Sequence, residues 1–152
     1  MARGAWARFD RGAWAVLATY GLGHAAVDAT CAALLFAAAT SGRIPARQAV
    51  FAFLLYNVVA FALQPAFGML VDRWRVARPA AILGGLLTAT ALPLSLLPRM
   101  ALAGVVVAGL GNAIFHVAGG SISLRLAPGR ASAPGIFVAP GAAGLAVGAL
   151  LG

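Results

Sequence analysis

Residues 100–124 read MALAGVVVAGLGNAIFHVAGGSISL, a run without a single charged side chain. The hydrocarbon core of a bilayer is about 30 Å thick and takes roughly 20 helical residues to cross. Further charge-free runs occupy residues 48–71, 79–98 and 131–152, and residues 12–42 are interrupted only by Asp28. These runs predict an all-α membrane helix bundle with five transmembrane helices, at about residues 13–39, 48–71, 79–98, 100–124 and 131–152.

The composition excludes an ordinary water-soluble domain. Only 9% of the 152 residues are charged and 62% are hydrophobic, whereas a soluble domain has about 25% charged residues. Lys and Glu are absent, so every charge is one of eleven Arg or three Asp residues. The connections between the apolar runs are short and leave no room for a soluble domain.

The distribution of arginine predicts the orientation of the bundle. One side of the bundle receives eight: Arg3, Arg8, Arg11, Arg73, Arg75, Arg78, Arg125 and Arg130. The other side receives three: Arg43, Arg47 and Arg99. Cytoplasmic loops of membrane proteins collect Lys and Arg, so we expect a multi-pass protein of the cytoplasmic (inner) membrane with its N-terminus in the cytoplasm. The net charge of +8 is thus explained by topology, and we expect no nucleic-acid partner.

Asp28 is the acid that falls in the middle of an apolar run. His24 precedes it by four residues, which places both side chains on one face of a helix. A charged group at the centre of a bilayer costs on the order of 2.5–3.5 kcal/mol, so it should face a partner or a wet cavity. We therefore expect the His24–Asp28 pair to be functional, although a protonated, neutral Asp28 would remove much of this cost.

Two other runs carry polar side chains on a single helix face. These are Asn57 and Gln64 in the second, and Asn112 and His116 in the fourth. If the three faces converge, they form a polar pathway for a small-molecule substrate and for protons. The alternative is that the amides are interhelical hydrogen-bond partners without a further role.

The loop after the second run resembles the G-x-x-x-D-R-x-G-R-R signature of the major facilitator superfamily. Gly68, Asp72 and Arg73 match it, and Arg75 replaces the second glycine. Three further stretches resemble the fosmidomycin-resistance-like branch of that superfamily: QPAFG at 64–68, H-x-x-x-D at 24–28 and GLGNAIFH at 109–116.

The last run resembles the glycine pattern that proton-coupled antiporters of this superfamily carry in their fifth helix. The matching residues are Gly135, Gly144, Gly148 and Gly152, with Ala149 where the pattern has proline. The superfamily's membrane-embedded arginine would fall at Val105. His24, Asp28 and His116 are then the remaining titratable candidates for proton coupling.

The resemblance implies a proton-coupled efflux or antiport transporter, not an enzyme and without cofactor or metal. Gly68, Asp72 and Arg73 would form its cytoplasmic gating loop. The superfamily has twelve helices in two halves, so residues 1–152 would be an incomplete N-terminal six-helix bundle that lacks its sixth helix. Such a fragment would not transport alone and would need the C-terminal half or a second bundle. The alternative is a membrane metal-binding or partner-assembly subunit that uses His24, Asp28 and His116.

Overall fold

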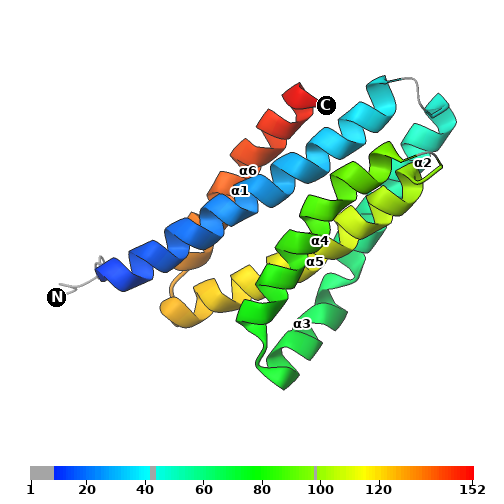
Figure 1. Cartoon of the computed structure of the whole chain (residues 1–152). Coiled ribbons are helices and arrows are strands. Elements are labelled where there is room, and N and C mark those ends of the chain that lie inside the picture. Colours follow the sequence, from blue (N-terminus) through cyan, green and yellow to red (C-terminus); the bar gives the residue numbers. More distant parts are fainter. Residues whose placement is uncertain (1–8, 42–43, 98) are drawn as a thin grey trace.

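The computed structural model describes residues 9–41, 44–97 and 99–152, which form helices and no strand (Figure 1). The elements are α1 (Arg11–Thr40), α2 (Ala46–Asn57), the π-helical segment η1 (Val58–Ala62), α3 (Gln64–Trp74), α4 (Ala77–Leu96), α5 (Ala101–Leu126) and α6 (Ser132–Leu151). Three arginines used in the sequence interpretation, Arg3, Arg8 and Arg43, lie outside the described residues, as does residue 98, the last of one predicted span.

Five helices in the described part of the chain are long and apolar enough to cross a membrane, as the sequence predicts. Four of them are α1, α4, α5 and α6, and the fifth is the segment Ala46–Trp74 made of α2, η1 and α3. The π-helical segment lies just before Pro65, which lacks the N–H that a regular helix needs at that position. Each span agrees with the predicted one to within a few residues.

Helix α5 is the centre of the bundle and packs against every other helix. The most extensive pairings are α4 with α5 and α1 with α6, and the second pair runs side by side in Figure 1. Both pairings depend on glycine: a Cβ on Gly84 would lie 2.7 Å from the carbonyl oxygen of Gly111, and one on Gly144 would overlap that of Ala25. Such small residues let helix backbones approach closely in lipid, where van der Waals contact drives association.

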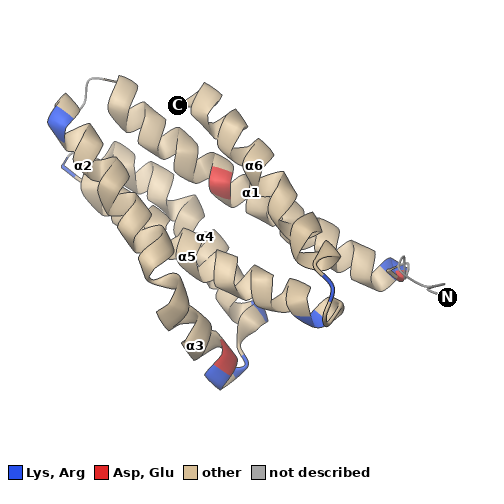
Figure 2. Ribbon diagram, turned by 180° about the vertical axis from the view of Figure 1, so that it is seen from behind, with Lys and Arg blue, Asp and Glu red and all other residues tan. Residues whose placement is uncertain are grey.

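The outer surface of the bundle is apolar. Large side chains on several helices, among them Leu22, Val58, Leu86 and Leu150, are exposed. Arginine is confined to the helix ends, and one acidic position interrupts the middle of α1 (Figure 2). An apolar circumference with charge at both ends fits a lipid bilayer, and the chain is a multi-pass membrane protein.

Candidate functional site

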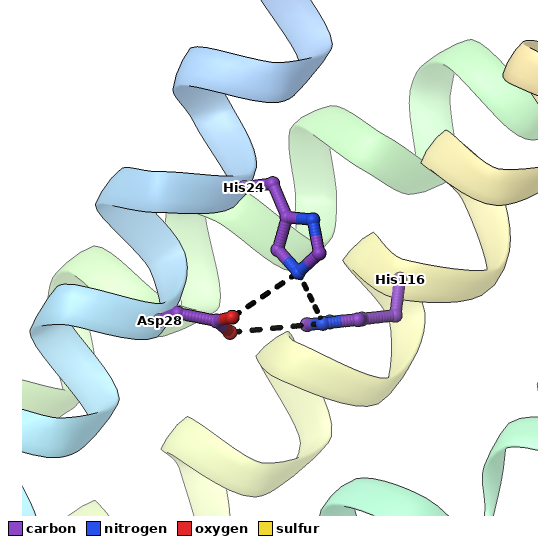
Figure 3. A group of neighbouring side chains, drawn as sticks. All are labelled: His24, Asp28 and His116. Atoms are coloured by element: carbon purple, nitrogen blue, oxygen red, sulfur yellow. Dashed lines mark hydrogen bonds and ion pairs between the residues drawn. The ribbon is translucent and has the colours of Figure 1, made fainter. Parts of the chain in front are cut away.

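His24 and Asp28 of α1 meet His116 of α5 (Figure 3). The Nε2 of His24 lies 3.1 Å from Oδ2 of Asp28, and the Nε2 of His116 lies 3.6 Å from Oδ1. The two Nε2 atoms are 2.6 Å apart. We call these three residues the triad, and they bring together two of the polar helix faces that the sequence predicts.

Backbone carbonyls fix the orientation of both imidazole rings. The Nδ1 of His24 is 2.9 Å from the carbonyl oxygen of Phe137 on α6, and the Nδ1 of His116 is 2.9 Å from that of Asn112. A carbonyl oxygen can only accept, so each Nδ1 carries the hydrogen. In the neutral form of either histidine, the Nε2 atom is therefore a lone-pair acceptor aimed into the triad.

Asn112 orients the carboxylate. Its Nδ2 donates to Oδ1 of Asp28 at 3.0 Å, and the same Nδ2 lies 4.0 Å from the sulfur of Cys31. Within the described residues, Oδ1 of Asn112 is a buried oxygen without a hydrogen-bond partner. Two triad members and the amide that orients them are deeply buried: His24, Asp28 and Asn112 are 3%, 6% and 2% exposed.

The triad opens onto a cleft of about 520 Å³. The side chain of His116 is the most accessible of the three, with 19% of its surface exposed. The cleft is lined by His24, Asp28, Ala32, Leu35, Phe36, Phe53, Tyr56, Asn57, Phe61, His116, Val138, Ala142 and Leu145. Asp28 is the only acid and there is no arginine among them, so the triad supplies the formal charge of a largely apolar cleft.

The third predicted polar face joins the site only in part. Asn57 lines the cleft, but its Nδ2 donates to the carbonyl of Phe53 in its own helix. Gln64 donates to the carbonyl of Ala60 and is not among the residues that line the cleft. Both amide side chains therefore donate to backbone carbonyls of their own membrane span, and neither forms a hydrogen bond with the triad.

Gly141 of α6 is a site residue that the sequence did not single out. A Cβ at this position would lie 2.5 Å from Nε2 of His24 and 2.7 Å from Oδ2 of Asp28. The absence of a side chain thus lets α6 cover the triad directly. Its only signal in the sequence is membership of a long series of glycines. The aromatic lining of the cleft, Phe36, Phe53, Tyr56 and Phe61, is likewise visible only in the structure.

The predicted glycine pattern on α6 packs along α1, except at its first member. Cβ atoms on Gly144, Gly148 and Gly152 would overlap the backbone carbonyls of α1, at Ala25, Ala29 and Ala33. Gly135 faces open space, and nothing lies within 4 Å of a Cβ built there. Three of the four glycines therefore serve the contact between α1 and α6.

The predicted gating loop lies at the C-terminal end of α3, and none of its residues lines the cleft beside the triad. Asp72 accepts a hydrogen bond from Nη2 of Arg125 at 3.1 Å and from Oγ of Ser121 at 3.4 Å, so it ties α3 to α5. Arg73 belongs to the last turn of α3, and Gly68 has open space on its side-chain face. Arg75 follows with φ of +55°, in the left-handed region that glycine favours.

The triad is the group that offers metal-type ligands in the described part of the chain. Its three ligand atoms lie within 4.8 Å of one another. No protein-family model matches the chain, and comparisons with curated proteins and with solved structures gave no match either.

Proposed function

We propose that the chain is part of a proton-coupled secondary transporter of small molecules, of the major facilitator type, in which the triad binds the coupling proton. The observation that carries this proposal is the convergence of His24, Asp28 and His116 on the cleft. Two lone-pair nitrogens and a carboxylate face one another there, and the cleft has the size of a small-molecule site.

Hydrogen-bond chemistry supports a proton in the triad. Two bare Nε2 atoms 2.6 Å apart repel, whereas a proton between them converts the contact into a hydrogen bond. With one proton the imidazoles and Asp28 are neutral overall, and with none they carry one negative charge away from water, which is strongly unfavourable. Proton release would therefore change the charge of the cleft wall and bias the bundle between conformations.

The Asp72–Arg125 contact supports a gating role for the end of α3. It links α3 to α5, and α5 carries His116, so movement at this end can reach the triad through one rigid helix. Alternating access requires two bundles that rock about a central site, and we therefore propose that a second bundle completes the pathway. The arginine distribution supports an inner-membrane protein with a cytoplasmic N-terminus.

The proposal is tested with the complete gene product in proteoliposomes that enclose a pH-sensitive dye. A panel of amphipathic small molecules is added, and substrate-driven proton movement is recorded for the wild type and for Asp28→Asn. We expect the wild type to move protons with at least one class of substrate and Asp28→Asn to lose this response.

Asp10→Asn is the matched control, because Asp10 caps α1 through the N–H of Ala13 and asparagine caps a helix equally well. Proton movement that survives in Asp28→Asn would overturn the proposed coupling site. Stable co-purification with a different membrane protein, together with no transport, would instead favour an assembly subunit.

A further inference from the structure

The triad has the donor set of a site for one metal ion. Its donors are two imidazole nitrogens and a carboxylate, and they come from α1 and α5. In a tetrahedral site with bonds of about 2.0–2.1 Å, two ligand atoms lie about 3.3 Å apart. The measured separations are 3.1 Å from Oδ2 of Asp28 to His24 and 3.6 Å from Oδ1 to His116, so each carboxylate oxygen lies near one imidazole. With one ligand atom taken from each residue, all three atoms lie within 4.8 Å of one another.

The two imidazole nitrogens are closer than a metal would hold them. Their separation of 2.6 Å would have to widen by about 0.7 Å to reach the tetrahedral value. His24 is fixed between α1 and α6, but His116 borders the cleft and its side chain is partly exposed. His116 is therefore the ligand that would have to move toward the cleft for the ion to enter.

The surrounding groups match those that support metal ligands in proteins. Ligating histidines donate their second N–H to a carbonyl or carboxylate, and ligating carboxylates accept a further hydrogen bond. Both Nδ1 atoms donate to backbone carbonyls, those of Phe137 and Asn112, and Asn112 donates to Asp28. The three ligands are thus already oriented with their free donor atoms inward.

Charge and accessibility also favour a cation here. Asp28 supplies a negative charge, and no arginine lines the cleft to compete for it. Asp28 and His24 are buried, while His116 faces the cleft, so an ion could enter from the cleft side. A fourth coordination position would face the cleft and accept water or a bound molecule.

We propose that His24, Asp28 and His116 bind one divalent transition-metal ion, through the two Nε2 atoms and a carboxylate oxygen. Two imidazoles with one carboxylate select ions such as Zn²⁺, Co²⁺ and Ni²⁺ over Mg²⁺ and Ca²⁺, which prefer oxygen ligands. The proposal develops the alternative from the sequence analysis, a metal-binding role for His24, Asp28 and His116. It does not depend on transport, although the ion and the coupling proton would compete for the same nitrogens.

The test uses the full 152-residue chain in detergent, purified with an affinity tag that contains no histidine. The chain has only two histidines, so imidazole ligation can come only from His24 and His116. Co²⁺ is added while visible d–d absorption is recorded, and Zn²⁺ binding is measured by calorimetry. We expect one equivalent of either ion to bind, with release of protons that grows as the pH falls.

His116→Ala and Asp28→Asn should each weaken binding at least tenfold and remove the cobalt bands. Thr30→Ala is the matched control on α1, because its side chain is only partly buried and its hydroxyl donates to the carbonyl of Ala26 in the same helix. This variant should bind like the wild type. His116→Ala is preferred to a change at the more buried His24, and circular dichroism checks that each variant is folded.

Several results would overturn the assignment. They are absence of one-to-one binding by the folded wild type, wild-type affinity in both His116→Ala and Asp28→Asn, and displacement of Co²⁺ by an equal concentration of Mg²⁺. Loss of binding in Thr30→Ala would also contradict it, since that side chain contacts no proposed ligand. None of these readouts uses transport. A negative result here would overturn the metal site without bearing on the proposed transporter, which is tested by proton movement.

Discussion

The Nε2 atoms of His24 and His116 lie 2.6 Å apart, although 92 positions separate the two residues in the chain. The contact joins α1 to α5, and the carbonyl of Phe137 that orients His24 adds α6. Three helices therefore meet at one pair of nitrogen atoms. Any movement of α6 along α1 would alter the orientation of His24, which makes the triad sensitive to helix arrangement.

Gly141→Ala should destabilise the bundle and disturb the triad. The new Cβ would lie 2.5 Å from Nε2 of His24, so either α6 or the ring must move. Overpacking of this kind costs about 1–3 kcal/mol. Unfolding in mixed micelles measures the loss, and Gly135→Ala is the control because its Cβ would meet open space. Equal stability of the two variants would show that α6 does not lie against the triad.

Asn112→Ala should destabilise the bundle on the order of 1 kcal/mol, because it removes the donor to Asp28. The effect should shrink when Asp28 is already asparagine, since the charged acceptor has then gone. A double-mutant cycle of Asn112→Ala and Asp28→Asn, read by unfolding, measures this coupling. Strict additivity of the two changes would refute the contact.

Arg75→Gly should stabilise the protein by about 0.5–1 kcal/mol. Arg75 ends α3 with φ of +55°, and its N–H and that of Val76 close the helix by bonding back to Asp72 and Val71. Glycine adopts this conformation without the steric penalty of a Cβ. Arg73→Gly, two residues earlier inside the helix, is the contrasting control and should destabilise. A lower midpoint for Arg75→Gly in thermal unfolding would contradict the prediction.

The Asp72–Arg125 pair should matter for motion and little for stability. Both side chains are mostly exposed, and such pairs contribute about 0–1 kcal/mol. We expect Asp72→Asn to leave the fold intact and to slow conformational exchange, observed with a fluorescence probe pair on α3 and α5. Arg125→Gln should reproduce the effect. Wild-type exchange rates in both variants would remove the gating role.

Hydropathy determined most of the fold in advance. Charge-free runs as long as 100–124 are not compatible with a water-soluble fold. The five spans and their approximate ends therefore follow from the position and length of each run. The His24–Asp28 pairing also follows from sequence, because residues four apart share a helix face. Their 3.1 Å contact lies within one helix and needs no tertiary structure.

Only the tertiary structure decided which polar groups meet. Lipid and the bundle interior are both apolar, so hydropathy does not fix how each helix is rotated about its own axis. The packing of α5 turns Asn112 and His116 toward Asp28, whereas Gln64 bonds within its own helix. The pairing of Asp72 with Arg125 and the contact of Gly141 with the triad arise in the same way. The sequence by itself determined five membrane helices and one buried acid, and close glycine-mediated packing decided what surrounds that acid.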